Sequence, residues 1–317
     1  MKTDALSRRL RFATPNPVVR RLVLTEADFR IFEAIDRHGP LPTHYLYQFT
    51  RHLRKDYTHL QNRLTEFYNG DARGIFLTRP TQQFAGFEAR YQHIVYDLAP
   101  RAKSVLADRR TLARFPPRRT EPFLHQLMQA CVGASFELTA PTKRLRYISR
   151  DEILTRVTCP PATRDAKNPM AIPLPGMGEQ RTLVPDDLFG LEYPGVGFRF
   201  FAVEIDRNTE SIERKNLDQA AFGRKVQSYL TVLRNQTHRT YFGLPNLSVL
   251  TVTTNATHAR NILAFIEKRN EPKYADRFAF ASEPSFGANW RVPREVLSYL
   301  LDEPWLTPVG AKDIAIP

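Results

Sequence analysis

Three acidic residues near the ends of two short apolar segments have the types and spacing that suit metal chemistry. Asp186 precedes one segment, and Glu204 and Asp206 end the next one. Side chains two apart in a strand share a face, so Glu204 and Asp206 lie together, which is unfavourable unless they are solvated, paired or metal-bound. We take all three as candidate ligands of Mg²⁺ or Mn²⁺, which bind oxygen atoms from several elements. An exposed sheet face with salt bridges to Arg199 or Arg207 is the alternative.

A helix is predicted directly after these strands, from Ser211 to Arg234, because apolar residues recur there near helical spacing. Lys225 and Tyr229 are four residues apart and therefore share one helical face. If the helix packs back on the sheet, the Lys225 ammonium lies over the acidic residues, where it would orient a water or stabilise the transition state of phosphoryl transfer. Asp186, Glu204 and Lys225 are therefore candidate catalytic residues. A solvated surface lysine is the alternative.

The positive charge of the chain is concentrated near its N-terminus. Residues 1–120 contain 22 Lys and Arg against 11 Asp and Glu, a net charge of +11, whereas residues 121–317 contain 24 against 22, a net charge of +2. A localised basic excess attracts a polyanion through counterion release, without choice of sequence. Solubilising charge would explain the total of +13 but not its distribution. Double-stranded DNA is therefore the expected partner.

The same basic region has the order of elements of a winged helix-turn-helix. The sequence predicts a helix that starts near Thr25 and ends at His38, a short second helix, a third helix and then a hairpin. The second helix lies within 41–49, the third within 55–67, and the hairpin strands within 75–80 and 91–98. The tip between these strands, from Thr81 to Arg90, would be the wing.

The third predicted helix has an apolar face and a polar face. Tyr57, Leu60, Leu64 and Phe67 recur at core spacing. The other face carries residue types that contact base edges and phosphates in a major groove. These candidate DNA contacts are Lys55, Thr58, His59, Gln61, Asn62 and Arg63, with Arg79 from the hairpin. Any solvated helix also has a polar outer face, so this remains the alternative.

The acidic stretch resembles a known protein family. Val184-Pro-Asp-Asp-Leu-Phe, then Ala202-Val-Glu-Ile-Asp-Arg-Asn-Thr-Glu210 and then Lys225, resembles the replication-relaxation family of plasmids and integrative elements. Members pair an N-terminal winged helix with a nuclease core of the PD-(D/E)XK type, and Lys225-Val-Gln-Ser-Tyr229 is similar to the helical Gln/Lys-x-x-x-Tyr signature of several branches of that core. The resemblance spans roughly residues 22–268.

One position departs from the nuclease motif. The lysine that usually follows two residues after the glutamate is Asp206 here. Activity would therefore depend on a lysine from another element, Lys225 or, as a second choice, Lys215. If neither reaches the site, the fold has been kept only for binding.

The sequence therefore predicts an α+β or α/β protein with two globular domains. We expect a basic arm over 1–21, a winged-helix domain over 22–115, and a nuclease-like mixed sheet flanked by helices over 120–317, with a Pro-rich insertion at 157–180. Only two cysteines are present, which argues against a disulfide scaffold or a zinc site. Without an apolar leader or a long apolar stretch, we expect a cytoplasmic protein that does not span a membrane.

Three functions remain open at this point. The first is a Mg²⁺-dependent endonuclease or nickase that acts in the replication, relaxation or transfer of a mobile element. The second is a non-catalytic DNA-binding initiator or regulator with a degenerate nuclease-like core, and the third is a transcription repressor whose C-terminal domain senses a ligand. A second copy of the chain, or other replication and transfer proteins, are candidate partners.

Overall fold

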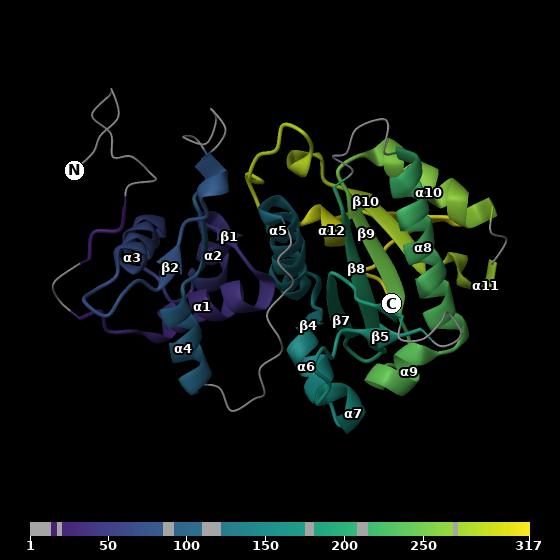
Figure 1. The fold of residues 1–317 in the computed structure, drawn as a ribbon, viewed down its shortest axis with the longest axis horizontal. Coiled ribbons are helices and arrows are strands. Elements are labelled where there is room, and N and C mark those ends of the chain that lie inside the picture. Colours follow the sequence, from purple (N-terminus) through teal and green to yellow (C-terminus); the bar gives the residue numbers. More distant parts are fainter. Residues whose placement is uncertain are drawn as a thin grey trace. The chain divides into compact units, whose positions relative to one another are not determined.

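The computed structural model describes residues 14–17, 21–84, 92–109, 122–174, 181–207, 215–268 and 272–317, without the side chains of 215–222, 268 and 272. These residues form two compact units (Figure 1). The first contains the described residues up to Arg109, those from 122 to Ala134, and the segment Arg291–Leu297. The second contains Ser135–Trp290 and Ser298–Pro317, as far as they are described.

The first unit combines helices with a small antiparallel sheet. Its sheet has the strand order β1-β3-β2, so the last strand in the sequence lies between the other two. In chain order the elements are α1 (Glu26–His38), β1 (Leu41–Pro42), α2 (Thr43–Thr50), α3 (Tyr57–Asn69), β2 (Leu77–Thr78), η1 (Thr81–Phe84), β3 (Val95–Leu98) and α4 (Pro100–Arg109). The helices and the hairpin therefore follow one another as the sequence predicts. Residues 85–91 of the expected wing lie outside the described part of the chain.

Aromatic residues fill the core of the first unit. The ring of Phe32 in α1 lies 5.0 Å from that of Phe67 in α3 and 5.7 Å from that of Phe76, which leads into β2. Leu60, Leu64 and Phe67 are buried, as their spacing in the sequence predicts. Aromatic pairs at such distances add to the free energy of simple apolar burial. This cluster fixes α3 against α1 and the sheet.

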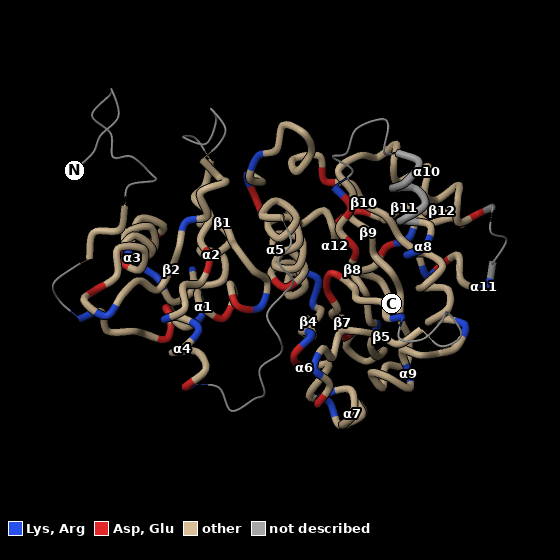
Figure 2. The backbone as a smooth tube through the Cα atoms, viewed as in Figure 1, with Lys and Arg blue, Asp and Glu red and all other residues tan. Residues whose placement is uncertain are grey.

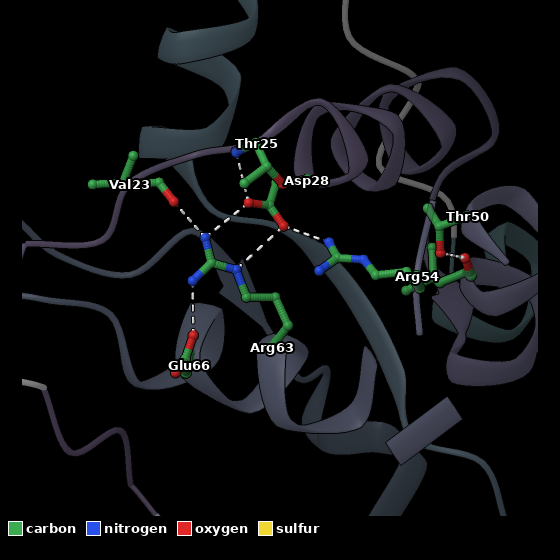
Figure 3. Close-up of polar contacts among 8 residues, drawn as sticks. Val23, Thr25, Asp28, Thr50, Arg54, Arg63 and Glu66 are labelled. Carbon is green, nitrogen blue, oxygen red and sulfur yellow. Dashed lines mark hydrogen bonds and ion pairs between the residues drawn. The ribbon is translucent and has the colours of Figure 1, made fainter. Parts of the chain in front are cut away.

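A buried carboxylate links the helices of this unit (Figure 3). Asp28 of α1 is fully buried and accepts a hydrogen bond of 2.8 Å from the backbone N–H of Thr25, which begins the helix. Arg63 of α3 donates to both Asp28 oxygens, at 3.2 Å from Nε and 2.8 Å from Nη2. Arg54, between α2 and α3, also donates to Asp28. Burial raises the pKa of Asp28, but these donors outweigh it and hold the pKa below its ordinary value.

The second unit is built around a mixed seven-stranded sheet with the order β12-β11-β10-β9-β8-β7-β4. The central strands β8, β9 and β10 run parallel to one another. The remaining neighbouring pairs, β4 with β7, β7 with β8, β10 with β11 and β11 with β12, are antiparallel. The strands are β4 (Arg146–Ile148), β7 (Asp187–Tyr193), β8 (Gly197–Asp206), β9 (Ser248–Thr253), β10 (Phe278–Ser282), β11 (Trp305–Thr307) and β12 (Gly310–Lys312). A mixed α/β architecture is thereby confirmed.

Helices cover both faces of this sheet. On one face α8 and α10 pack with a cluster of buried residues that includes Tyr229, Leu230 and Ile262. On the other face Phe136 near the end of α5 stacks on Phe189 of β7, with ring centroids 4.5 Å apart. The helices of this unit are the end of α5 (Phe123–Thr139) from Ser135 on, α6 (Arg150–Thr155), α7 (Pro161–Arg164), α8 (Lys215–Arg234), α9 (Thr237–Phe242), α10 (Ala256–Lys268), α11 (Pro272–Ala275) and α12 (Tyr299–Asp302), with the short turns η3 (Ala140–Lys143) and η5 (Pro284–Phe286).

The Pro-rich insertion has secondary structure of its own. It contains α7 and the strand β5 (Ile172–Pro173), which pairs with β6 (Thr182–Leu183) in a separate two-stranded sheet. Residues 175–180 of this insertion lie outside the described part of the chain. Across the described helices, none combines the length and the apolar character that crossing a bilayer requires.

Asp28→Asn should destabilise the first unit by about 3–5 kcal/mol, because it leaves two buried guanidinium groups without their shared carboxylate. A lowered pKa stabilises the fold above the unfolded pKa of about 3.9, and this contribution is lost as the pH falls through the folded pKa. The difference between wild type and variant in urea unfolding should therefore be large at pH 7 and shrink below about pH 4. Glu26→Gln, an exposed acid in the same helix, is the matched control and should have a much smaller effect. Similar midpoints for the two variants at pH 7 would contradict this role.

Candidate functional site

Asp186 and Glu204 lie together because β7 and β8 are paired at this point. The backbone N–H of Asp186 donates to the Val203 carbonyl at 3.0 Å, just before β7 begins. Its side chain accepts a hydrogen bond of 2.7 Å from the Ile205 N–H of β8. Asp186 is thus tied to the two residues that flank Glu204, whose own side chain is only 2% exposed. The expected pairing of an acid from one strand with an acid from the next is present.

Lys225 and Tyr229 of α8 contact this pair from above the sheet. The Lys225 ammonium forms an ion pair with Glu204 Oε2, and it lies 4.0 Å from Asp186 Oδ2. The Tyr229 hydroxyl donates to the other oxygen of Glu204, Oε1. Their four-residue spacing places both side chains over the same carboxylate, as the sequence predicts. Lys215, the second-choice lysine, has a side chain outside the described part of the chain.

Close helix packing holds α8 in this place. At Gly223 a Cβ atom would lie 2.9 Å from the Cζ atom of Phe265 in α10, which is too close for an undisturbed contact. A glycine two residues before Lys225 therefore permits α8 and α10 to approach. This contact helps to set the distance between the Lys225 side chain in α8 and the carboxylates of Asp186 and Glu204.

The electrostatics of the cluster follow from its burial. Burial raises the pKa of Glu204 because the charged form is poorly solvated, and the Lys225 ammonium opposes this rise. Burial would lower the pKa of Lys225, but Glu204 and Asp186 outweigh this effect and raise it. We conclude that Lys225 is a cation held by two acidic neighbours.

Asp206 has a different partner from the one the metal-site prediction gives it. Its Oδ2 atom lies 2.6 Å from Nε2 of His258, in the first turn of α10. The side chain of His258 is 10% exposed and that of Asp206 is 22% exposed. Asp206 still lies on the same strand face as Glu204, so the pair with His258 borders the cluster. Sequence reasoning did not include His258; its signal is a position just after a parallel strand, at the edge where ligands of such sheets bind.

The carboxylates of Asp186 and Glu204 could bind a divalent cation, but they do not by themselves supply all of its ligands. Within the part of the chain that the structure describes, no three His, Cys, Asp or Glu side chains are grouped as a metal site. Asp186 and Glu204 nevertheless supply two carboxylates at one point. Mg²⁺ is commonly held by one or two carboxylates together with water and substrate phosphates, so these two residues fit such an ion. Asp206 as a third ligand stays a prediction, and one of its oxygens, Oδ2, is hydrogen-bonded to His258.

The candidate DNA-binding residues of the first unit divide into two groups. An exposed group comprises Lys55, Thr58, His59, Gln61 and Asn62, at the start of α3 and just before it. Asp56 begins this helix by accepting a hydrogen bond of 2.7 Å from the His59 N–H. These exposed side chains are in a position to contact a partner.

Arg63 and Arg79 form the second group and are engaged within the unit. Arg63 is 14% exposed and donates to Asp28, to Glu66 at 2.7 Å and to the Val23 carbonyl at 2.6 Å. Arg79 donates to the Tyr96 hydroxyl at 2.9 Å, and its guanidinium lies 4.1 Å from the centre of the Tyr68 ring. Both arginines therefore hold the fold together.

Most of the basic excess lies outside the described residues. Within residues 1–120, the described part contains 12 Lys and Arg against 9 Asp and Glu, a net charge of +3. The remaining 10 Lys and Arg and 2 Asp and Glu give +8, which completes the total of +11. Figure 2 shows acidic as well as basic positions among the described elements of this unit. The excess therefore belongs mainly to 1–13 (net +3), 18–20 (net +1) and 110–120 (net +4).

Comparison with known proteins identifies the family. Searches of curated proteins and of solved structures found no match. A family model described as Replication-relaxation matches residues 32–247, which is more than half of the chain and includes α3, Asp186, Glu204 and Lys225. The chain therefore belongs to the replication-relaxation family.

Proposed function

We propose that this chain is a DNA-binding protein of a plasmid or integrative element, and that its second unit is a Mg²⁺- or Mn²⁺-dependent endonuclease that nicks DNA during replication, relaxation or transfer. The observation that carries the proposal is the meeting of Asp186, Glu204 and Lys225 at one point, from a strand end, a neighbouring strand and a helix. Two carboxylates with one adjacent ammonium group suit the metal-assisted hydrolysis of a phosphodiester.

The order of elements around the cluster supports a PD-(D/E)XK type of core. Apart from α6, α7, β5 and β6 after β4 and the short helix α9 after α8, the chain runs α5, β4, β7, β8, α8 and β9, and the sheet places β4, β7, β8 and β9 side by side in that order. Strands β8 and β9 are parallel and are connected through α8. This is the arrangement that the resemblance to such nucleases implies.

Each residue of the cluster has a defined task in this mechanism. Asp186 and Glu204 would hold the cation, and Tyr229 fixes the orientation of Glu204 through its hydrogen bond to Oε1. A bound divalent cation would activate water and neutralise charge on the scissile phosphate. Lys225 supplies the positive charge that the motif lysine gives elsewhere, and it stabilises the negative charge that builds up on the phosphoryl oxygens.

The first unit would bring the protein to duplex DNA as a winged helix. Its order α1, β1, α2, α3, β2 and β3 and its sheet order β1-β3-β2 support this interpretation. The exposed polar residues at the start of α3 would enter the major groove, as recognition helices do with their N-terminal residues. The basic segments outside the described residues would add contacts to phosphates.

A non-catalytic initiator or regulator is the second candidate, and one observation favours it. The position of the usual motif lysine is Asp206, and this residue is hydrogen-bonded to His258. In that case the cluster would be a structural remnant and the first unit would carry the function.

A triple variant in which Ala replaces Lys55, Gln61 and Asn62 should bind duplex DNA from the protein's own element more weakly. The variant lacks exposed side chains at the start of α3 and just before it that would donate hydrogen bonds to DNA. Gel shifts at several salt concentrations should show a smaller salt dependence, with the slope reduced by about 0.9 for the one phosphate contact that Lys55 makes. The full chain is required, since the first unit includes residues after 122 and the segment 291–297. Lys143→Ala, an exposed lysine of the second unit, is the charge-matched control. If the triple variant keeps wild-type affinity and slope, α3 does not contact DNA.

Lys225→Met should reduce nicking of supercoiled origin DNA by about 10²- to 10³-fold, because one electrostatic group of the transition state is removed. Asp186→Asn and Glu204→Gln should abolish nicking, and both should keep the gel-shift affinity of wild type. The assay compares Mg²⁺, Mn²⁺ and EDTA, with Lys143→Met as a control that should nick normally. If wild-type protein binds its origin DNA but nicks it with neither cation, the nuclease proposal is refuted and the non-catalytic function replaces it.

A further inference from the structure

The Lys225 ammonium occupies the point at which a cation would join the two carboxylates. It contacts Glu204 Oε2 and lies 4.0 Å from Asp186 Oδ2. Apart from this ammonium, Glu204 Oε2 has no hydrogen-bond partner among the residues that the structure describes. The oxygen that is best placed for a metal is therefore already paired with a charge of the protein itself.

The burial of Glu204 explains why it forms an ion pair with Lys225. A charge that is removed from water is costly unless an opposite charge or hydrogen-bond donors replace the water. Tyr229 satisfies Oε1, and Lys225 compensates the charge at Oε2. Asp186 adds a second negative charge nearby, which strengthens the hold on Lys225.

The two carboxylates and Lys225 differ in their freedom to move. Glu204 is 2% exposed and Asp186 is bound to the β8 backbone, whereas the side chain of Lys225 is 35% exposed. A lysine has a flexible stem of four carbons and no fixed geometry of contact, so it can leave a carboxylate without a change in the backbone. Tyr229 would continue to hold Glu204 after Lys225 has moved.

We propose that Lys225 is a built-in counter-ion that competes with the divalent cation for Glu204 and Asp186, so that the cation binds only when the ammonium swings away. This inference rests on the proposed metal-dependent function, and it adds a regulation of the same site. The ammonium that has been displaced needs a new negative partner, and a DNA phosphate is a suitable one. The site therefore stays closed to metal in the free protein and opens when DNA is present.

The test is calorimetry of Mn²⁺ binding to the full chain without DNA, at pH 8. Lys225→Met should bind Mn²⁺ at least about tenfold more tightly than wild type once the buried Glu204 has lost its proton, because the competing charge is absent. Lys225→Arg keeps a competing cation and should bind as weakly as wild type, and Lys143→Met should change nothing. Glu204→Gln in the Lys225→Met background should abolish the gain, which assigns the binding to this site.

A second measurement follows Lys225 itself. Reductive methylation mapped by mass spectrometry should modify Lys225 slowly in the free wild-type protein and several times faster with saturating Mn²⁺, while Lys143 is modified at an unchanged rate. Equal or weaker Mn²⁺ binding by Lys225→Met, or methylation of Lys225 that Mn²⁺ does not change, overturns the proposal. Circular dichroism of each variant checks that the fold is kept.

The outcomes separate this inference from the proposed nuclease. Wild-type nicking together with unchanged Mn²⁺ affinity in Lys225→Met refutes the competition and leaves the nuclease intact. Tighter Mn²⁺ binding by Lys225→Met in a protein that never nicks supports the competition and refutes the nuclease. If no variant binds Mn²⁺ at any concentration up to the millimolar range, the competition is refuted.

Discussion

A carboxylate that is removed from water keeps its charge only if other groups replace the lost solvation, and the arrangement of the second unit depends on this constraint at Glu204. Two residues of α8 replace the lost solvation of Glu204: Tyr229 donates a hydrogen bond to one carboxylate oxygen, and Lys225 forms an ion pair with the other. Gly223 permits the close approach of α8 to Phe265 of α10, and Asp186 just before β7 is hydrogen-bonded to the backbone of β8. The contacts of the Glu204 side chain therefore depend both on how α8 packs and on how the strands pair.

Both units contain a buried carboxylate, yet their cationic partners differ in kind. Asp28 is held by two guanidinium groups, and the planar fork of an arginine makes several hydrogen bonds in a fixed geometry. Glu204 is held by one ammonium on a flexible stem. An arginine network suits a joint between helices that must not move, whereas a lysine contact can be exchanged for another cation. The choice between arginine and lysine thus distinguishes a charge held in a fixed geometry from one that can change its partner.

The sequence predicts most elements of this fold because its periodicities are local. The core positions Leu60, Leu64 and Phe67 and the shared face of Lys225 and Tyr229 follow from helical spacing, and both are present. Family resemblance also placed Asp186 and Glu204 in one site, where the structure brings them together.

Other features could not be predicted because they depend on partners distant in the sequence. Arg63 has the spacing of an outward-facing residue, but its partner Asp28 lies 35 residues away on another helix. Only the tertiary structure shows that Arg63 is used inside the unit. Likewise, the contact between Asp206 and His258, which is 52 residues later, could not be predicted from spacing.

The segment Arg291–Leu297 has a consequence for the order in which the protein is completed during synthesis. It belongs to the first unit, where the backbone N–H of Val292 donates to the Gln92 side chain, 200 residues earlier in the chain, at 2.9 Å. Val292 and Leu297 are both buried. Domains generally fold as their residues leave the ribosome, the N-terminal one first. Here the first unit cannot finish its packing until β4 to β10 of the second unit have been translated, so a chain that ends before residue 291 would lack part of the first unit as well as part of the sheet.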